Sequence, residues 1–243
     1  MKKHVLFICL LLFPLHFTHA AKVEPWLLPK IQSAAQPNLT SNAKGELILS
    51  WIERTAKGHR LQIATYRNNN WTATSTVAEG NNWFVNWADF PGTVALADGT
   101  LWAHYLVKSG EGTYAYDVIL RHSKDNGKTW SSAIKVNDDG TKTEHGFVSL
   151  WPWSASEVAV AWLDGRKTQG ASGHDHHLSI QDKNSDKVMT LRTAVFDAHG
   201  KKLNEWPLDQ RTCDCCQTDA AVTDKGPIVI YRDRDSNEIR DIY

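Results

Sequence analysis

The eight residues from Ser123 to Trp130, Ser-Lys-Asp-Asn-Gly-Lys-Thr-Trp, constrain the fold most, because they fit one tight turn. Asp125 can cap backbone N–H groups with its carboxylate, and Gly127 can take the positive φ that closes the turn. Ser123 and Thr129 can hydrogen-bond across its neck, and the Trp130 ring can bury apolar area beneath it. Alternating residues on both sides predict a β-hairpin around this turn.

A unit of short strands and turns recurs four times along the chain. Its clearest member is an apolar strand that ends in a polar cluster, at residues 46–54, 100–108, 157–166 and 227–234. A shorter strand precedes each copy, at 37–39, 92–96, 146–150 and 218–222, and another follows, at 60–66, 117–121, 189–196 and from 238 onward. Such units are typical of propeller blades, and no stretch of the mature chain has helical periodicity. The sequence predicts an all-β fold.

The turn at 123–130, read as S-x-D-x-G-x-T-W, resembles the Asp-box, or BNR repeat, of the sialidase-like six-bladed β-propellers. In that family the box lies on the outer rim of a blade, away from the ligand. The resemblance implies a sialidase-like β-propeller of four-stranded blades, of which this chain covers about the first three and a half to four. We expect one propeller domain over 21–243, truncated at its C-terminus because the fourth unit stops within a strand.

The first twenty residues have the pattern of an export signal. A basic start precedes an apolar run from Val5 to Phe17, and small residues at Thr18–Ala20 offer a cleavage point. The apolar run is short for a bilayer span, and no later segment is apolar enough, so we predict a periplasmic or secreted protein without a membrane span after cleavage. The 27 basic and 27 acidic residues balance, which argues against nucleic acid as a partner.

An acidic residue and an arginine recur after the second strand of several units, where the family binds its ligand. The resulting candidates are Glu53, Asp164 and Asp233 as catalytic carboxylates, and Arg54, Arg166, Arg232 and Arg234 as substrate-binding residues. The resemblance implies a carbohydrate ligand, and converging guanidinium groups, which suit a carboxylate, indicate an anionic sugar as its specific form. No cofactor is predicted.

The resemblance leaves two functions open. Sialidases use three arginines on the sugar carboxylate, an Asp as acid/base and a Tyr activated by a Glu. Arg232 resembles the second arginine, whereas Leu27-Leu28-Pro29 stands where an Arg-containing motif is expected. One hypothesis is therefore an exo-sialidase-type glycoside hydrolase. The alternative is a non-catalytic propeller that binds a glycan or a protein partner on the same face.

Three cysteines cluster in Cys213-Asp-Cys215-Cys216, just before the strand that leads to Arg232. In an oxidising compartment we expect at least one disulfide among them or to a cysteine beyond the sequence, with thiolate ligation of zinc or copper as the alternative. The run Gly173–His177 offers imidazole and carboxylate groups, but polar loop residues explain it more simply, and no metal site is predicted. The eleven tryptophans are expected to pack between sheets, with a few stacking on sugar as the alternative.

Overall fold

The computed structural model describes residues 23–29, 31, 33–170 and 187–243, and its elements are almost entirely β-strands. The predicted export signal and Gly173–His177 lie outside the described residues. Where the chain is described, no helix is long and apolar enough to cross a membrane.

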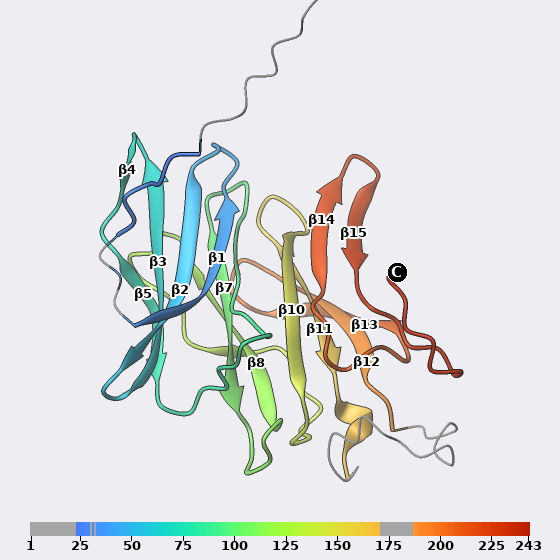
Figure 1. Cartoon of the computed structure of the whole chain (residues 1–243). Coiled ribbons are helices and arrows are strands. Elements are labelled where there is room, and N and C mark those ends of the chain that lie inside the picture. The colour runs from blue at the N-terminus through green and yellow to red at the C-terminus, as the bar shows by residue number, and fades with distance from the viewer. Residues whose placement is uncertain (1–22, 30, 32, 171–186) are drawn as a thin grey trace, which may run out of the picture.

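The strands form four consecutive antiparallel sheets (Figure 1). The first sheet contains β1 (Ala34–Ser41), β2 (Leu47–Thr55), β3 (Gly58–Arg67) and β4 (Asn70–Trp71), with β5 (Ser75–Gly80) also paired to β3. The second contains β6 (Thr93–Ala95), β7 (Leu101–Lys108), β8 (Tyr116–Ser123) and β9 (Ile134–Lys135). The third contains β10 (His145–Pro152), β11 (Val158–Asp164), β12 (Thr190–Phe196) and β13 (Lys202–Asp209). The fourth is the hairpin of β14 (Asp219–Thr223) and β15 (Gly226–Ile230).

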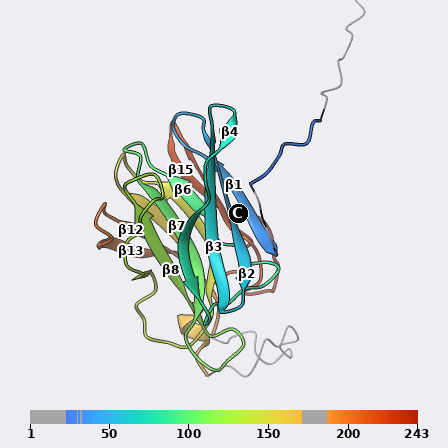
Figure 2. The ribbon, with the colours of Figure 1, turned by 90° about the vertical axis from the view of Figure 1, so that its left-hand side faces the viewer.

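Neighbouring sheets meet through their first strands, since β1 contacts β6, β6 contacts β10, and β10 contacts β14. Seen from the side of the first sheet, the later sheets lie behind it (Figure 2). This arrangement is that of successive β-propeller blades, and the predicted fold class is confirmed. Residues 238–243, predicted to begin a further strand, do not form one. They run back beside Tyr231, which exchanges two 3.0 Å backbone hydrogen bonds with Tyr243.

The hydrophobic core lies between the blades, and strand alternation divides it. In β7, Leu101, Ala103 and Tyr105 join the cluster shared with the first blade. Trp102 and Leu106, on the opposite face of the same strand, join the cluster shared with the third blade. Both faces of a middle strand are therefore buried, which explains its continuous run of apolar residues.

The turn that dominates the sequence forms the β8–β9 hairpin with the predicted hydrogen bonds. Thr129 donates to Asp125 through both its backbone N–H, at 2.9 Å, and its hydroxyl, at 2.6 Å. The buried Gly127 has φ +81°, its N–H donates to the Ser123 hydroxyl at 2.8 Å, and its carbonyl accepts the Trp130 indole N–H at 3.1 Å. The carbonyl of Gly127 also accepts a hydrogen bond from a side chain of β5, so this turn joins two blades.

Candidate functional site

One end of the blades brings two sets of loops together. The pairs β1–β2 and β10–β11 are antiparallel, so Ala34 lies opposite Glu53, and His145 lies opposite Asp164. The first strand of a blade therefore begins where the second strand ends. We call this end the loop face. The short 3-10 helix η1 (Arg166–Thr168) follows β11 there, at the lower side of Figure 1.

Two acidic side chains on the loop face lie against one tyrosine hydroxyl. The Tyr116 hydroxyl is 2.8 Å from Glu144 Oε1 and 3.4 Å from Asp89 Oδ2. Asp89 is 2% exposed and Glu144 is 7% exposed. Asp89 also accepts a 2.9 Å hydrogen bond from the backbone N–H of Phe147, whose φ of +51° is uncommon for a bulky residue. Asp89, Tyr116 and Glu144 are called the carboxyl cluster below.

Burial sets the protonation of the carboxyl cluster. It raises the pKa of Asp89 to about 7, although hydrogen bonds from Phe147 and Tyr116 act in the other direction. It also raises the pKa of Glu144 to about 8, opposed by the Tyr116 hydrogen bond and reinforced by the negative charges of Asp214 and Asp89. The cluster thus holds carboxyl protons near neutral pH, which is what a carboxyl general acid requires.

The loop that carries Asp89 is fixed from several blades. Within the loop, the Asn86 side-chain oxygen accepts hydrogen bonds from the backbone N–H groups of Ala88, at 2.8 Å, and Asp89, at 2.7 Å. The Gln36 side chain, from β1, donates to the Asn86 carbonyl, and the Gln217 side chain, just before β14, donates to the Ala88 carbonyl. Hydrogen bonds from β1 and from the segment before β14 therefore fasten this loop to the loop face.

Trp87 stands within this fixed loop and is 90% exposed. Fully buried tryptophans elsewhere, such as Trp51 and Trp162, serve the core as the sequence predicted. Trp87 has no such role, because almost all of its ring faces solvent. It offers a flat apolar surface two residues from Asp89.

A second polar group on the loop face centres on His145, which is completely buried. Its Nε2 lies 3.0 Å from Asp139 Oδ2 and 3.9 Å from Asp164 Oδ2, and its Nδ1 lies 4.0 Å from Asp117 Oδ1. Burial acts to lower the pKa of His145, but the hydrogen bond to Asp139 and the charges of Asp164 and Asp139 outweigh it and raise the pKa. This group is a buried ionic network.

Two of the predicted catalytic carboxylates hold structural contacts. Glu53 accepts the indole N–H of Trp51 at 3.0 Å, and Asp164 accepts that of Trp162 at 2.8 Å, so the two blades repeat one Trp-x-acid contact. Asp164 is 0% exposed and also binds the Arg166 guanidinium with two hydrogen bonds, of 2.7 and 2.8 Å. These contacts stabilise the blade, and the catalytic role of both residues stays a prediction.

The third predicted carboxylate, Asp233, lies after β15. It forms an isolated bridge with Thr212, and its N–H donates to the Asp241 carbonyl at 2.8 Å. Arg234 is buried and bound to Glu238 through bonds of 2.9 to 3.1 Å. These contacts tie the segment after β15 partly to itself and, through Thr212, to the segment before β14.

The predicted substrate-binding arginines have different surroundings. Arg54 is exposed at the end of β2. Arg166 is bound to Asp164 and, at 3.0 Å, to Glu205 Oε1. Arg232 directs Nη1 to the Cys216 sulfur at 3.5 Å. The structure gives each arginine its own environment, and their joint role in binding a sugar stays a prediction.

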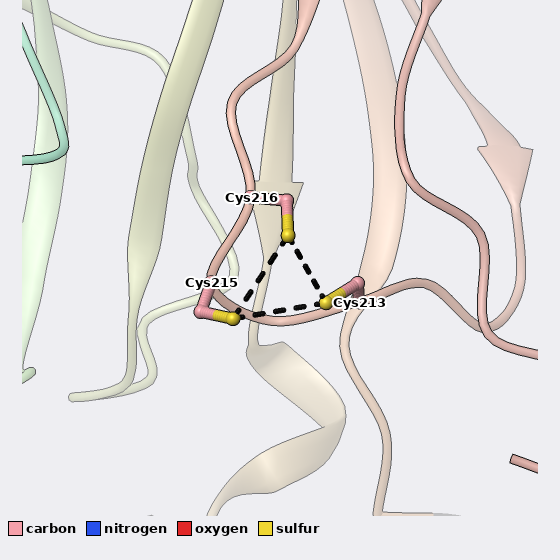
Figure 3. Close-up of side chains that lie close together, drawn as sticks. All are labelled: Cys213, Cys215 and Cys216. Atoms are coloured by element: carbon pink, nitrogen blue, oxygen red, sulfur yellow. Dashed lines mark hydrogen bonds between the residues drawn. The ribbon is translucent and has the colours of Figure 1, made fainter. Parts of the chain in front are cut away.

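The three cysteines lie on the loop face just before β14, with their sulfur atoms directed toward one another (Figure 3). The Sγ–Sγ separations are 3.7 Å for Cys213–Cys215, 3.3 Å for Cys213–Cys216 and 3.9 Å for Cys215–Cys216. A disulfide bond is about 2.05 Å long, so all three are separate thiols here. The disulfide stays a prediction, whereas the proximity of the sulfurs is established.

Sequence reasoning missed Asp89, Glu144 and Trp87. It searched only the loops that follow second strands, and these residues lie in loops that lead into the first strands of the second and third blades. The sequence did hold a signal for these residues. Antiparallel pairing places the loops that lead into first strands at the same end of a blade as the loops that follow second strands. Glu144 lies two residues before the start of the predicted strand at 146–150.

Comparison with known proteins supports the fold. No protein-family model and no curated protein sequence matches the chain. A solved structure of a protein of unknown function from Dyadobacter fermentans matches 84% of this chain and 50% of its own, with 13% identity and a TM-score of 0.56. The Penicillium chrysogenum alpha-L-arabinanase complexed with arabinobiose matches 86% of this chain and 61% of its own, with 13% identity and a TM-score of 0.51.

The GH93 alpha-L-arabinofuranosidase of Fusarium graminearum, also with arabinobiose, matches 83% of this chain and 56% of its own, with 11% identity and a TM-score of 0.51. The chain therefore spans roughly half to three fifths of the length of these structures. The class that the fold defines is the β-propeller.

Proposed function

We propose that this propeller acts on a glycan at the loop face, as a glycoside hydrolase that uses the carboxyl cluster. The observation that carries the proposal is the pairing of Asp89 and Glu144 on one tyrosine hydroxyl, with raised pKa values, beside the exposed Trp87. Hydrolysis of a glycosidic bond needs a carboxylic acid that stays protonated near neutral pH and a second carboxylate.

The spacing within the pair supports one type of mechanism. Because both carboxyl groups lie against the same hydroxyl, their nearest oxygens are at most about 6 Å apart. Inverting glycosidases hold their carboxyls roughly 6.5–9.5 Å apart, to leave room for a water, and retaining ones about 5.5 Å apart. The retaining spacing fits better, and Glu144, whose pKa burial raises to about 8, is the acid in this proposal.

The choice of a sugar ligand rests on two observations. Trp87 presents its ring to solvent from a fixed loop, which suits stacking on the apolar face of a pyranose or furanose. Two structures of similar fold, an arabinanase and an arabinofuranosidase, hold arabinobiose. An anionic sugar of the sialic acid type would rely on Arg54 and Arg232, because Arg166 already binds carboxylates.

A second candidate function is glycan binding without hydrolysis. The burial of both carboxyls favours it, since a group that is 2% or 7% exposed has little surface to offer a substrate. In this case the carboxyl cluster stabilises the loop, and Trp87 supplies the binding surface. The two functions share a site and differ in the role of Glu144.

Hydrolysis of aryl α-L-arabinofuranosides, arabinan and a fluorogenic sialoside, measured with the full chain, tests both functions. We expect Glu144→Gln to lower kcat at least about a hundredfold, because the glutamine amide cannot act as the general acid. Trp87→Ala should raise KM, whereas Trp153→Ala should not, because Trp153 is exposed at the opposite end of the blade, after β10.

The remaining outcomes separate the hypotheses. Glycan binding that is lost in Trp87→Ala, without turnover by the parent chain, supports the non-catalytic function. Turnover that survives Glu144→Gln contradicts the assigned acid. If the chain shows neither turnover nor Trp87-dependent glycan binding, the loop face is not a glycan site.

A further inference from the structure

We propose that Cys213, Cys215 and Cys216 form a binding site for one thiophilic metal ion, Zn(II) or Cu(I), held by three thiolates. The site is separate from the carboxyl cluster and does not depend on the proposed function. It takes up thiolate ligation, which the sequence left as the alternative to a disulfide among these cysteines.

The geometry of the sulfur triangle carries the inference. Three sulfurs separated by 3.3, 3.7 and 3.9 Å lie on a circle with a radius of about 2.1 Å. A zinc ion about 2.3 Å from each sulfur would stand about 0.9 Å above their plane, close to its place in a regular tetrahedron. One coordination position then remains for another ligand. An ion in the plane is three-coordinate, an arrangement open to Cu(I), for which thiolates are preferred ligands.

The backbone holds the three thiols in this arrangement. The Cys213 N–H donates to the Arg232 carbonyl at 3.0 Å, and Thr212 pairs with Asp233 in a β-bridge. On the other side of the cluster, Gln217 is bound to the fixed loop through the Ala88 carbonyl. A preformed site costs little conformational entropy when the ion binds.

The surroundings of the sulfurs fit a metal–thiolate group. The guanidinium of Arg232 lies 3.5 Å from the Cys216 sulfur, and that of Arg240 lies 4.0 Å from the Cys213 sulfur. Three thiolates with one Cu(I) or Zn(II) carry a net negative charge, which these two cations balance as outer donors. Cys213 is fully buried and Cys215 is exposed, so the site has a buried base and an open side for the ion.

The other group that could hold a metal is a weaker candidate. Asp139, His145 and Asp164 also place one ligand atom each within a short distance of the others. Arg166, however, already occupies both oxygens of Asp164, at 2.7 and 2.8 Å. A cation there would have to displace a bidentate guanidinium, whereas Arg232 and Arg240 each contact a single sulfur of the thiol cluster, at 3.5 and 4.0 Å.

Metal binding by the full chain, reduced and then freed of reductant under argon, tests the proposal. Zn(II) and Cu(I) are titrated separately against a chromophoric chelator of each ion. We expect one equivalent of at least one ion to bind with proton release, and X-ray absorption to show three sulfur neighbours, at about 2.3 Å for zinc. Cys215→Ser and Cys216→Ser should each weaken metal binding at least about a hundredfold. The loss of a group that only hydrogen-bonds to a metal ligand already lowers metal affinity 10- to 100-fold, and these variants lose a ligand itself.

Controls keep the test decisive. Asp214→Asn changes the same loop but keeps all three thiols, and Asp139→Asn disrupts the other candidate group; both should bind the ion as the parent chain does. Circular dichroism of each variant checks that the fold is retained, and Cys215, as the exposed cysteine, is the least disruptive to replace. Less than a tenth of an equivalent bound, binding unchanged in both serine variants, or fewer than three sulfur neighbours would overturn the proposal.

Discussion

Asp164 illustrates how an acidic residue at a strand end can serve the fold. Its position, after Trp162 and before Arg166, made it a predicted catalytic residue. In the structure its oxygens are bound by the Trp162 indole and the Arg166 guanidinium, and it has no exposed surface. These contacts within the blade account for an acid at this position, and a catalytic role for Asp164 stays a prediction.

We therefore expect Asp164→Asn to destabilise the protein without a specific catalytic defect. Neutralising Asp164 removes one partner of a buried ion pair and leaves Arg166 with Glu205 and Asp139 alone, at a cost of up to about 3–5 kcal/mol. Urea unfolding should show this loss, while Asp224→Asn, an exposed change in the β14–β15 turn, should leave the midpoint within error. An unchanged midpoint together with lost turnover would restore Asp164 as a catalytic residue.

At the scale of elements, the strands could be predicted from the sequence because strand alternation is local. The first and second strands of all four units, and the third strands of the first three, lie where the repeated unit places them, within a few residues. The loop face could not be predicted in the same way. The burial of Asp89 arises from Phe147 and Tyr116, which lie in other strands and far along the chain. No local pattern contains that information.

The β8–β9 hairpin allows backbone strain and packing to be separated. Gly127 has φ +81°, and a Cβ there would lie 2.7 Å from Cδ1 of Ile63 in the first blade. Gly140 has φ +75° and no atom within 4 Å of the corresponding position. Gly140→Ala should cost about 1–2 kcal/mol through φ alone. Gly127→Ala should cost about 1–3 kcal/mol more, because Ile63 must also move.

Equilibrium unfolding of the two alanine variants measures this difference directly. Equal losses would mean that the hairpin does not press on the neighbouring blade in solution. A similar turn in the third blade, where Gly200 has φ +83° and its Cβ position lies 2.4 Å from Cδ1 of Ile134, offers an independent repeat of the test.

At the scale of the whole molecule, the blades are joined by buried ionisable groups as well as by apolar side chains. The carboxyl cluster links the loop before β6, strand β8 and the start of β10. The network of His145 links β10 to Asp139 and Asp117. Protonation of these groups is therefore coupled to the packing of the second blade against the third.

The sign of this coupling can be worked out. Asp89 and Glu144 have folded-state pKa values of about 7 and about 8, above those of the unfolded chain, so the unfolded state loses these protons first. The folded state keeps these two protons over a pH range in which the unfolded state has lost them. The free energy of unfolding that they contribute therefore falls as the pH rises from about 4 toward 8. The raised pKa of His145 acts in the same direction, because its stabilisation is complete below pH 6.5 and is lost as the pH passes the folded value. The lowered pKa of Asp139 affects the stability only in acid, below a pH of about 4.

We accordingly expect the protein to be less stable at pH 8 than at pH 5.5, with a melting temperature lower by roughly 5–10 °C. Asp89→Asn should reduce this difference, because the amide does not titrate and its oxygen can still accept the Phe147 N–H. Asp224→Asn should leave the difference unchanged. Thermal unfolding followed by circular dichroism across this pH range measures both effects. A protein equally stable at the two pH values would mean that Asp89 and Glu144 are ionised at neutral pH, which would also remove Glu144 as the general acid.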